Sequence, residues 1–249
     1  MNNIKRSVCM ATYNGTPFIK DQLDSILPQL GPQDEIIISD DGSSDDTMDI
    51  VKALNDPRIK IYLNQFRNPI LNFEFALSRS EGDLVFLSDQ DDLWEPDKVK
   101  TVSELLEKYD LVVTDCRVID HKGSITHDSF YELRRSGKGL LKNFYKNSYL
   151  GCCMAVKRHI VKKSLPFPKR IPMHDIWIGM IGELFGSTFF CSEKLVNYRR
   201  HGGNKTFTTE TSQNSLYRKS MLRWRLFICL LTRYTSIKFG RKHHSWRTT

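Results

Sequence analysis

The sequence predicts an α/β fold in which a mostly parallel central sheet is flanked by helices. The 249 residues are 40% hydrophobic and 27% charged, which is ordinary for a globular chain with a core to bury. Apolar segments of strand length alternate with amphipathic segments of helix length through the first half, as in parallel sheets with crossover helices. Acidic clusters follow two of the expected strands, and ligands of open α/β sheets bind at the carboxyl ends of strands.

Apolar runs bounded by turn residues predict five strands in the first half of the chain. These runs are residues 6–13, 35–39, 59–63, 83–88 and 111–114. Amphipathic spacing between cap and stop residues predicts the connecting helices. They are residues 17–30, 45–54, 72–79 and 95–108.

The second half of the chain is less regular. Residues 120–146 are polar and basic and contain glycines, so we expect loops or a small irregular subdomain there. Further elements are expected as a strand at 150–156, a helix at 173–185, a strand at 187–198 and a helix from 216. The pattern predicts a domain at 1–210 and a basic amphipathic tail at 211–249.

The excess positive charge is concentrated in this tail. Residues 211–249 contain nine Lys or Arg and no Asp or Glu, whereas the formal net charge of the whole chain is +8. A role in nucleic-acid binding would rest on the tail alone, and we expect none. The aromatic and basic tail predicts an interfacial helix on an anionic membrane, through Trp224, Leu226, Phe227 and Leu230. The alternative is a helix packed on the domain with its charges in water.

The cysteines and the apolar segments indicate the cellular compartment of the protein. None of the six cysteines forms a CxxC pair, and most lie in apolar segments, so we expect them to be reduced and buried. No apolar run approaches the roughly 20 residues needed to span a bilayer, and the N-terminal residues lack the pattern of a signal peptide. We expect a cytoplasmic protein that is peripheral on the inner face of the cell membrane.

Two acidic clusters at strand ends predict a metal site. Asp40 and Asp41 follow one expected strand, and Asp89, Asp91 and Asp92 follow another. Crowded carboxylates repel one another unless positive charge lies among them. Mg²⁺ or Mn²⁺, held by one or two carboxylates together with substrate phosphates, answers this requirement.

Five motifs stand in a familiar order. They are MATYN at 10–14, ISDDGSSD at 38–45, SDQDDLWEPD at 88–97, MHDIW at 173–177 and YRRHGGN at 198–204. In these motifs the chain resembles the family 2 inverting glycosyltransferases over residues 4–204. The resemblance implies a Rossmann-like GT-A fold, with a nucleotide-sugar-binding half at 1–115 and an acceptor half at 116–210. The DQDDLW and HDxW forms are most similar to bacterial rhamnosyltransferases of O-antigen and capsule synthesis.

The resemblance also implies the donor-binding residues. The nucleotide pocket would be lined by Ala11, Thr12, Tyr13 and Asn14. Asp41 would accept a hydrogen bond from the N3–H of uracil or thymine. Asp89 would hold the ribose or a water on the metal, and Asp91 would bind the metal between the two phosphates. Asn72 would contact the donor, or else belong to the polar face of its helix.

The second half should supply the base. The resemblance places it at Asp175, at the start of an apolar helix, with a first-turn acid favoured by the helix dipole as the alternative. Glu183 is the weaker candidate. In the loop that follows, Arg200 and His201 would contact the pyrophosphate or the metal, ahead of Arg199, and an ordinary basic surface loop is the alternative.

The sequence therefore predicts transfer of a sugar, with rhamnose suggested, from a dTDP- or UDP-linked donor to a saccharide acceptor. A lipid-linked acceptor would suit a tail on an anionic membrane. The rival functions are an inactive nucleotide-sugar-binding homologue and, ranked lower, a nucleotidyltransferase. The latter would typically carry a basic, glycine-rich loop where this chain reads ATYNGTPF.

Overall fold

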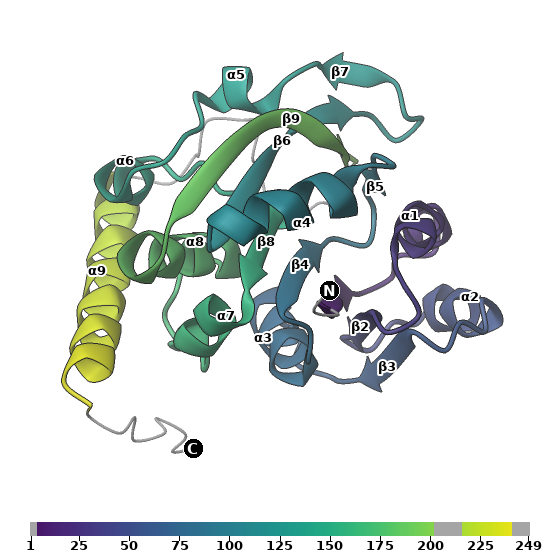
Figure 1. The fold of residues 1–249 in the computed structure, drawn as a ribbon, viewed down its shortest axis with the longest axis horizontal. Helices are drawn as coiled ribbons and strands as arrows, with labels where there is room; N and C mark the ends of the chain where they lie inside the picture. Colours follow the sequence, from purple (N-terminus) through teal and green to yellow (C-terminus); the bar gives the residue numbers. More distant parts are fainter. Residues whose placement is uncertain (1–3, 202–215, 241–249) are drawn as a thin grey trace.

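A mixed sheet of nine strands organises the part of the chain that the computed structural model describes, residues 4–201 and 216–240 (Figure 1). Eight strands follow one another across the sheet in the order β3-β2-β1-β4-β8-β6-β9-β5, and β7 pairs with β6. The strands are β1 (Arg6–Thr12), β2 (Glu35–Asp40), β3 (Ile59–Leu63), β4 (Leu84–Ser88), β5 (Leu93–Trp94), β6 (Leu111–Ile119), β7 (Ile125–His127), β8 (Met154–Lys157) and β9 (Thr188–Arg199).

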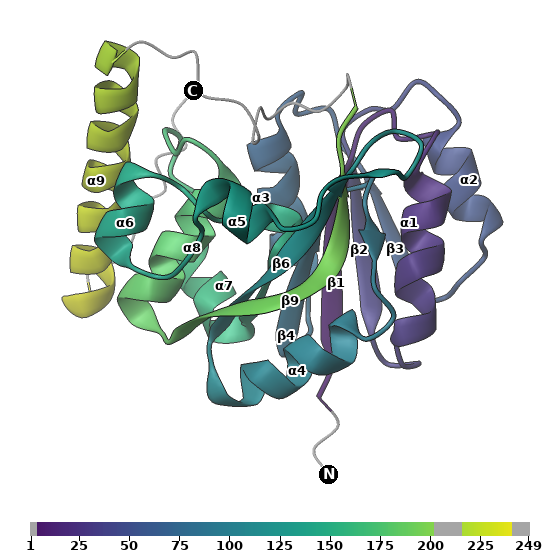
Figure 2. The same ribbon diagram turned by 90° about the horizontal axis from the view of Figure 1, so that it is seen from above.

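Helices cover this sheet. They are α1 (Ile19–Ile26), α2 (Thr47–Ala53), α3 (Pro69–Arg79), α4 (Lys98–Lys108), α5 (Phe130–Arg134), α6 (Leu140–Tyr145), α7 (Arg158–Ser164), α8 (His174–Phe185) and α9 (Leu216–Lys238). Two short 3₁₀ turns span Leu27–Gln29 and Gly151–Cys153. Figure 2 shows α1 and α2 at one end of the molecule and α6, α8 and α9 at the other.

The first half has the predicted parallel topology. β1 pairs in parallel with β2 and β4, and β2 pairs in parallel with β3. The register places Thr12 opposite Asp40, and Met10 opposite Ser88. The carboxyl ends of β1, β2 and β4 therefore meet at one edge of the sheet, and the acidic clusters that follow β2 and β4 are brought together there.

The second half mixes directions. β8 lies antiparallel between β4 and β6, β5 is antiparallel to β9, and only β9 runs parallel to β6. The expected loops at 120–146 contain β7, α5 and α6, and the helix expected from 95 begins at Lys98. The strand β5 was not expected, because a two-residue strand is defined by its pairing with β9, which local pattern cannot reveal.

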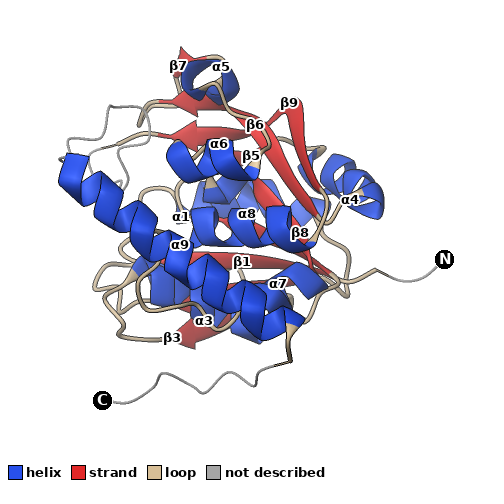
Figure 3. Ribbon diagram, turned by 90° about the vertical axis from the view of Figure 1, so that its left-hand side faces the viewer, coloured by secondary structure: helices blue, strands red, loops and turns tan. Residues whose placement is uncertain are grey.

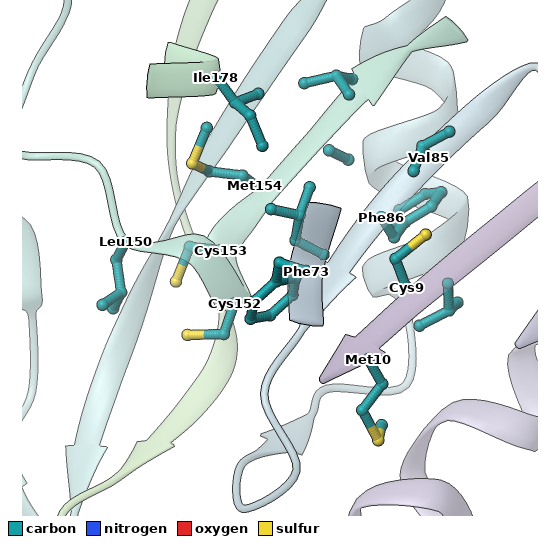
Figure 4. Packing of buried hydrophobic residues seen from close by; sticks show 14 of the residues in the cluster. Cys9, Met10, Phe73, Val85, Phe86, Leu150, Cys152, Cys153, Met154 and Ile178 are labelled. Atoms are coloured by element: carbon teal, nitrogen blue, oxygen red, sulfur yellow. The ribbon is translucent and has the colours of Figure 1, made fainter. Parts of the chain in front are cut away.

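The core lies between the parallel strands and the helices. Phe73 of α3 lies between the ends of the central strands and the Cys152–Cys153 turn, as Figure 4 shows. All six cysteines are free, and five of them are buried, as predicted. Their thiols fill space in the core as small apolar groups.

The C-terminal helix α9 is packed on the domain (Figure 3). Leu226 and Leu230, which we expected at a membrane, are instead buried. Arg233 is buried as well, and its guanidinium donates to the carbonyl oxygens of Lys163, Leu165 and Pro166. It also lies 5.3 Å from the ring centroid of Trp177 in α8. No helix in residues 4–201 and 216–240 is long and apolar enough to span a membrane.

Removal of the Arg233 guanidinium should destabilise the fold. We expect Arg233→Met to lower the free energy of unfolding by about 2–3 kcal/mol, because three carbonyl oxygens at the end of α7 lose a buried charged donor. Urea denaturation followed by circular dichroism measures this change. Arg225→Met, at a partly exposed position of the same helix, is the control and should change stability by less than about 0.5 kcal/mol. Equal effects of the two variants would contradict the anchoring role.

Candidate functional site

The loop that follows β1 is held from below by buried polar side chains. Asn72 of α3 donates from Nδ2 to the carbonyl oxygen of Thr12 at 3.3 Å, and its Oδ1 accepts from the Ser39 hydroxyl at 2.5 Å. The Thr12 hydroxyl donates to Asp40 at 3.0 Å. Asn72 is almost fully buried, so it does not belong to a solvated helix face. It braces the ends of β1 and β2 beneath the expected donor pocket, and its contact with a donor stays a prediction.

The Tyr13–Asn14 segment forms the exposed rim of this edge. Gln90 accepts from the Tyr13 amide at 2.8 Å and donates to the Tyr13 carbonyl at 3.0 Å. Asn14 has a φ of 49° and accepts from the Ser44 amide at 2.9 Å. Ala11 is partly buried at the end of β1. Gln90 thus ties the loop after β1 to the loop after β4, and the motifs in the sequence did not single this residue out.

Asp41 is fixed by the loop that precedes α3. Its two carboxylate oxygens accept from the backbone amides of Arg67 at 2.7 Å and Asn68 at 2.8 Å. Each oxygen of an ionised carboxylate has room for a second hydrogen bond. The predicted contact with the N3–H of a pyrimidine is therefore compatible with this arrangement.

The three acids after β4 are crowded. Burial raises the pKa of Asp89 to about 8, with the charges of Asp91 and Asp175 adding to the effect. Burial also raises the pKa of Asp92, and its neighbours Asp91 and Asp89 raise it further. Asp92 Oδ1 accepts from the Arg199 amide, whereas Oδ2 has no hydrogen-bond partner among the described residues. The mutual repulsion of these carboxylates favours protonation or a bound cation at this turn.

Lys98 supplies one positive charge beneath the turn. Its ammonium group is buried, donates to the carbonyl oxygen of Cys152 at 2.7 Å and lies 3.7 Å from the ring centroid of Trp94. Burial lowers the pKa of Lys98 to about 8, and the attraction of Asp92 opposes that decrease. Trp94 is itself buried. The position of Lys98 in the first turn of α4 gave no sign of this role.

Arg199 and His201 hold the turn from the opposite side. Arg199 is buried, and it donates from Nε to the Asp91 carbonyl at 2.9 Å and from its amide to Asp92 at 2.9 Å. Nε2 of His201 lies 2.7 Å from Asp91 Oδ2. Phe18, at the start of α1, lies 4.7 Å from the Arg199 guanidinium and 4.9 Å from the His201 ring. Arg199 and His201 thus contact both the acidic turn and the ring of Phe18.

Within the YRRH motif, Arg199 holds the acidic turn directly. Our ranking of Arg200 ahead of Arg199 concerned contact with the pyrophosphate or the metal, and it stays a prediction. The backbone amide of Arg200 donates to the Ile119 carbonyl at 2.8 Å, and a donor contact of its side chain stays a prediction. The rest of the motif, residues 202–204, lies outside the described residues.

Asp175 lies in the first turn of α8, close enough to Asp89 to raise the pKa of that acid. Burial raises the pKa of Asp175 to about 6, although its Oδ1 accepts from the Ile176 amide at 2.6 Å. A carboxylate with such a pKa can accept a proton near neutral pH. Glu183, the alternative, accepts from the Gly139 amide and the Tyr149 hydroxyl, and so holds the segment before α6.

His174 beside Asp175 is a neutral, buried imidazole. Its ring stacks on Phe73 with 3.9 Å between centroids, and burial lowers the pKa of His174 to about 3. Neither ring nitrogen has a hydrogen-bond partner within the described chain. A side chain at Gly151 would lie 2.9 Å from Nε2, so glycine at this position leaves room for the ring.

The donor set fits a hard divalent cation. Asp89, Asp92 and Cys152 have ligand atoms within 4.8 Å of one another, but burial raises the pKa of the Cys152 thiol, and Mg²⁺ and Mn²⁺ prefer oxygen. The Asp91 side chain is more exposed than that of Asp92, and its carboxylate lies next to the His201 ring. Metal binding by Asp91, with Asp89 and His201 beside it, stays a prediction.

Two curated relatives are similar over most of the chain. The putative teichuronic acid biosynthesis glycosyltransferase TuaG of Bacillus subtilis is 27% identical over 211 residues, 78% of this chain and 78% of the relative. The dTDP-rhamnosyl transferase RfbG of Shigella flexneri is 26% identical over 221 residues, 79% of this chain and 73% of the relative.

Solved structures share the fold. TarS of S. aureus in complex with UDP-GlcNAc superposes with a TM-score of 0.67 at 18% identity, over 96% of this chain and 74% of that one. Glucosyl-3-phosphoglycerate synthase from Mycobacterium tuberculosis, in complex with Mn²⁺, UDP and glucosyl-3-phosphoglycerate, gives a TM-score of 0.57 at 20% identity, over 93% of this chain and 80% of that one. These likenesses confirm the predicted GT-A fold.

The family model described as glycosyl transferase family 2 matches residues 7–165, from the start of β1 to the end of α7. This match covers more than half of the sequence and includes the acidic turn after β4. The chain belongs to glycosyl transferase family 2.

Proposed function

We propose that the chain is a metal-dependent, inverting glycosyltransferase of cell-surface polysaccharide synthesis. The observation that carries the proposal is the meeting of the acidic turn after β4 with Asp175 at the start of α8. The Asp175 carboxyl, with a pKa of about 6, lies near acids whose mutual repulsion a bound cation would relieve. Both lie at the sheet edge where ligands of α/β folds bind. This arrangement supports a displacement at a sugar phosphate, in which Asp175 would accept the proton and the acidic turn would lie next to the diphosphate.

The donor would bind along the ends of β1, β2 and β4. Asp41 would accept from the pyrimidine N3–H, and the backbone of the 11–14 segment would line the nucleotide. Asp91, with Asp89 and His201, would hold Mg²⁺ or Mn²⁺ next to the diphosphate. When bound, the cation neutralises charge that develops on the leaving diphosphate, so no general acid is required.

Asp175 would act as the general base. The acceptor hydroxyl oxygen forms a bond to C1 of the sugar from the face opposite the diphosphate. The bond between C1 and the diphosphate oxygen breaks, its electron pair leaves with the nucleotide, and the hydroxyl proton passes to Asp175. One displacement of this kind inverts the configuration at C1.

The relatives guide the choice of substrates. The S. flexneri relative is named as a dTDP-rhamnosyl transferase, and the DQDDLW and HDxW motifs resemble such enzymes, which favours transfer of rhamnose from a dTDP- or UDP-linked donor. The B. subtilis relative is named for a wall polysaccharide, which favours a saccharide acceptor. A lipid-linked acceptor, with the enzyme peripheral on the inner membrane face, would suit the basic C-terminal segment.

The metal assignment can be tested at Asp91. We expect Asp91→Asn to abolish the Mn²⁺-dependent part of UDP or dTDP binding while the fold stays intact, because one ligand charge is lost. Calorimetric titration with and without Mn²⁺ measures this part. Asp49→Asn, an exposed position on α2, is the matched control and should bind like the wild type. An unchanged Mn²⁺ effect in the Asp91 variant would refute the assignment.

The base assignment predicts a pH profile. The ionised form of Asp175 is required, so kcat should fall about tenfold for each pH unit below the pKa of about 6. Asp175→Asn should lower kcat by about 10²–10⁴-fold and remove this acid limb while donor affinity changes little. Steady-state kinetics with donor binding measured in parallel would show it. Loss of donor binding without a separate loss of turnover would exclude Asp175 as the base.

Arg199 should act as a positioning residue. Arg199→Met removes the donor that fixes the Asp91 carbonyl, and we expect Mn²⁺-dependent UDP affinity to fall about tenfold. Affinity for uridine, which has no phosphate, should stay the same. Arg199→Lys keeps the charge but not the Nε contact, so it should not rescue binding. Full rescue by lysine, or an equal loss of uridine binding, would speak against positioning of the turn.

A further inference from the structure

Helix α9 carries two apolar faces. One faces the domain and contains Leu226 and Leu230. The other faces outward and contains Trp224, Phe227, Ile228 and Leu231, whose side chains are 42–63% exposed. The spacing of this second set is i, i+3, i+4 and i+7, which places all four on one helix face over about 10 Å. The domain therefore accounts for one face and leaves the other in solvent.

The short helix α6 extends this outward apolar face. Arg223 of α9 donates to the Tyr145 carbonyl at 2.7 Å and lies 5.2 Å from the Tyr145 ring centroid, so the two helices are in contact. Leu141 and Tyr145 of α6 are 75% and 67% exposed. Figure 3 shows α6 beside α9. We call these six exposed apolar residues the outer face: Leu141, Tyr145, Trp224, Phe227, Ile228 and Leu231.

Basic residues surround the outer face. On α9, Arg223 and Arg225 stand on either side of its apolar stripe. The exposed Lys142 of α6 and Lys146, which directly follows α6, add two more bases. Neither helix contains an Asp or Glu. An apolar stripe between bases is the arrangement of helices that lie in the headgroup region of anionic membranes.

A second copy of the chain would be a poor occupant. In a symmetric dimer the same patch meets itself, so the bases of one copy would face the bases of the other. Like charges placed opposite one another across an interface disfavour association. The surface thus complements an anionic partner with an apolar interior.

We propose that the outer face docks the enzyme on an anionic lipid bilayer, by insertion of its apolar side chains between headgroups that pair with the surrounding bases. This inference rests on the proposed peripheral location at the membrane, and it names the surface responsible. It differs from the expectation drawn from sequence, because Leu226 and Leu230 are used inside the protein. Deletion of α9 would be a poor test, since Arg233 and both leucines belong to the fold.

Point variants of the full chain give a cleaner test. Vesicles of phosphatidylcholine with 0 or about 40% phosphatidylglycerol would be sedimented with wild-type protein and with the double variant Phe227→Ser, Leu231→Ser. We expect binding to anionic vesicles only, weakened at least tenfold by the double variant. Leu63→Ser, at a more exposed leucine on the edge strand β3, is the control and should bind normally.

Trp224 reports the depth of insertion. Brominated lipids should quench part of the tryptophan emission, and Trp224→Phe should remove that part. Binding retained by the double variant would overturn the outer face as the docking surface. No binding by the wild type would overturn the membrane location as well. The transferase proposal would still be tested separately, by the measurement of Mn²⁺-dependent UDP binding. A concentration-dependent dimer that the double variant abolishes would identify a second copy as the occupant instead.

Discussion

Three carboxylates stand in one turn at the carboxyl end of β4, and much of the surrounding structure serves to hold that unfavourable charge in place. Burial and mutual repulsion raise the pKa values of Asp89 and Asp92, so the turn favours protons or a cation. Lys98 gives one buried positive charge below it, and Arg199 fixes its backbone from the side. Such strongly shifted pKa values are typical of sites that bind a charged ligand.

The same constraint explains how the two halves of the chain are joined. The parallel half supplies the strand ends and the acids, and the mixed half supplies Arg199 from β9 and Asp175 from α8. β9 reaches the turn because it runs alongside β6 and then pairs with β5, immediately after the acids. The proposed proton acceptor and the proposed diphosphate site therefore meet where these two halves meet.

Much of this site could be predicted from the sequence, since its acids follow apolar runs that can only be buried strands. Asp89 and Asp91 were identifiable because crowded carboxylates after a buried strand repel one another unless positive charge lies among them. Asp175 was identifiable because the family resemblance places the base there, at the start of an apolar helix. Gln90, Lys98 and Arg199 could not be identified in this way. Their partners lie 77, 54 and 108 residues away along the chain, and such contacts exist only in the folded protein. From the sequence we likewise expected residues of both apolar faces of α9 at a membrane. Spacing alone does not show which face of a helix the domain covers.

The most direct measurement is a crystal structure of the full chain with UDP and Mn²⁺, in which anomalous scattering locates the manganese. We predict manganese bound by Asp91 and both phosphates, the uracil against Asp41, and Asp175 across the sugar-binding space from the diphosphate. Manganese at Asp92 and Cys152, or a nucleotide bound away from the ends of β1, β2 and β4, would contradict this assignment of the site.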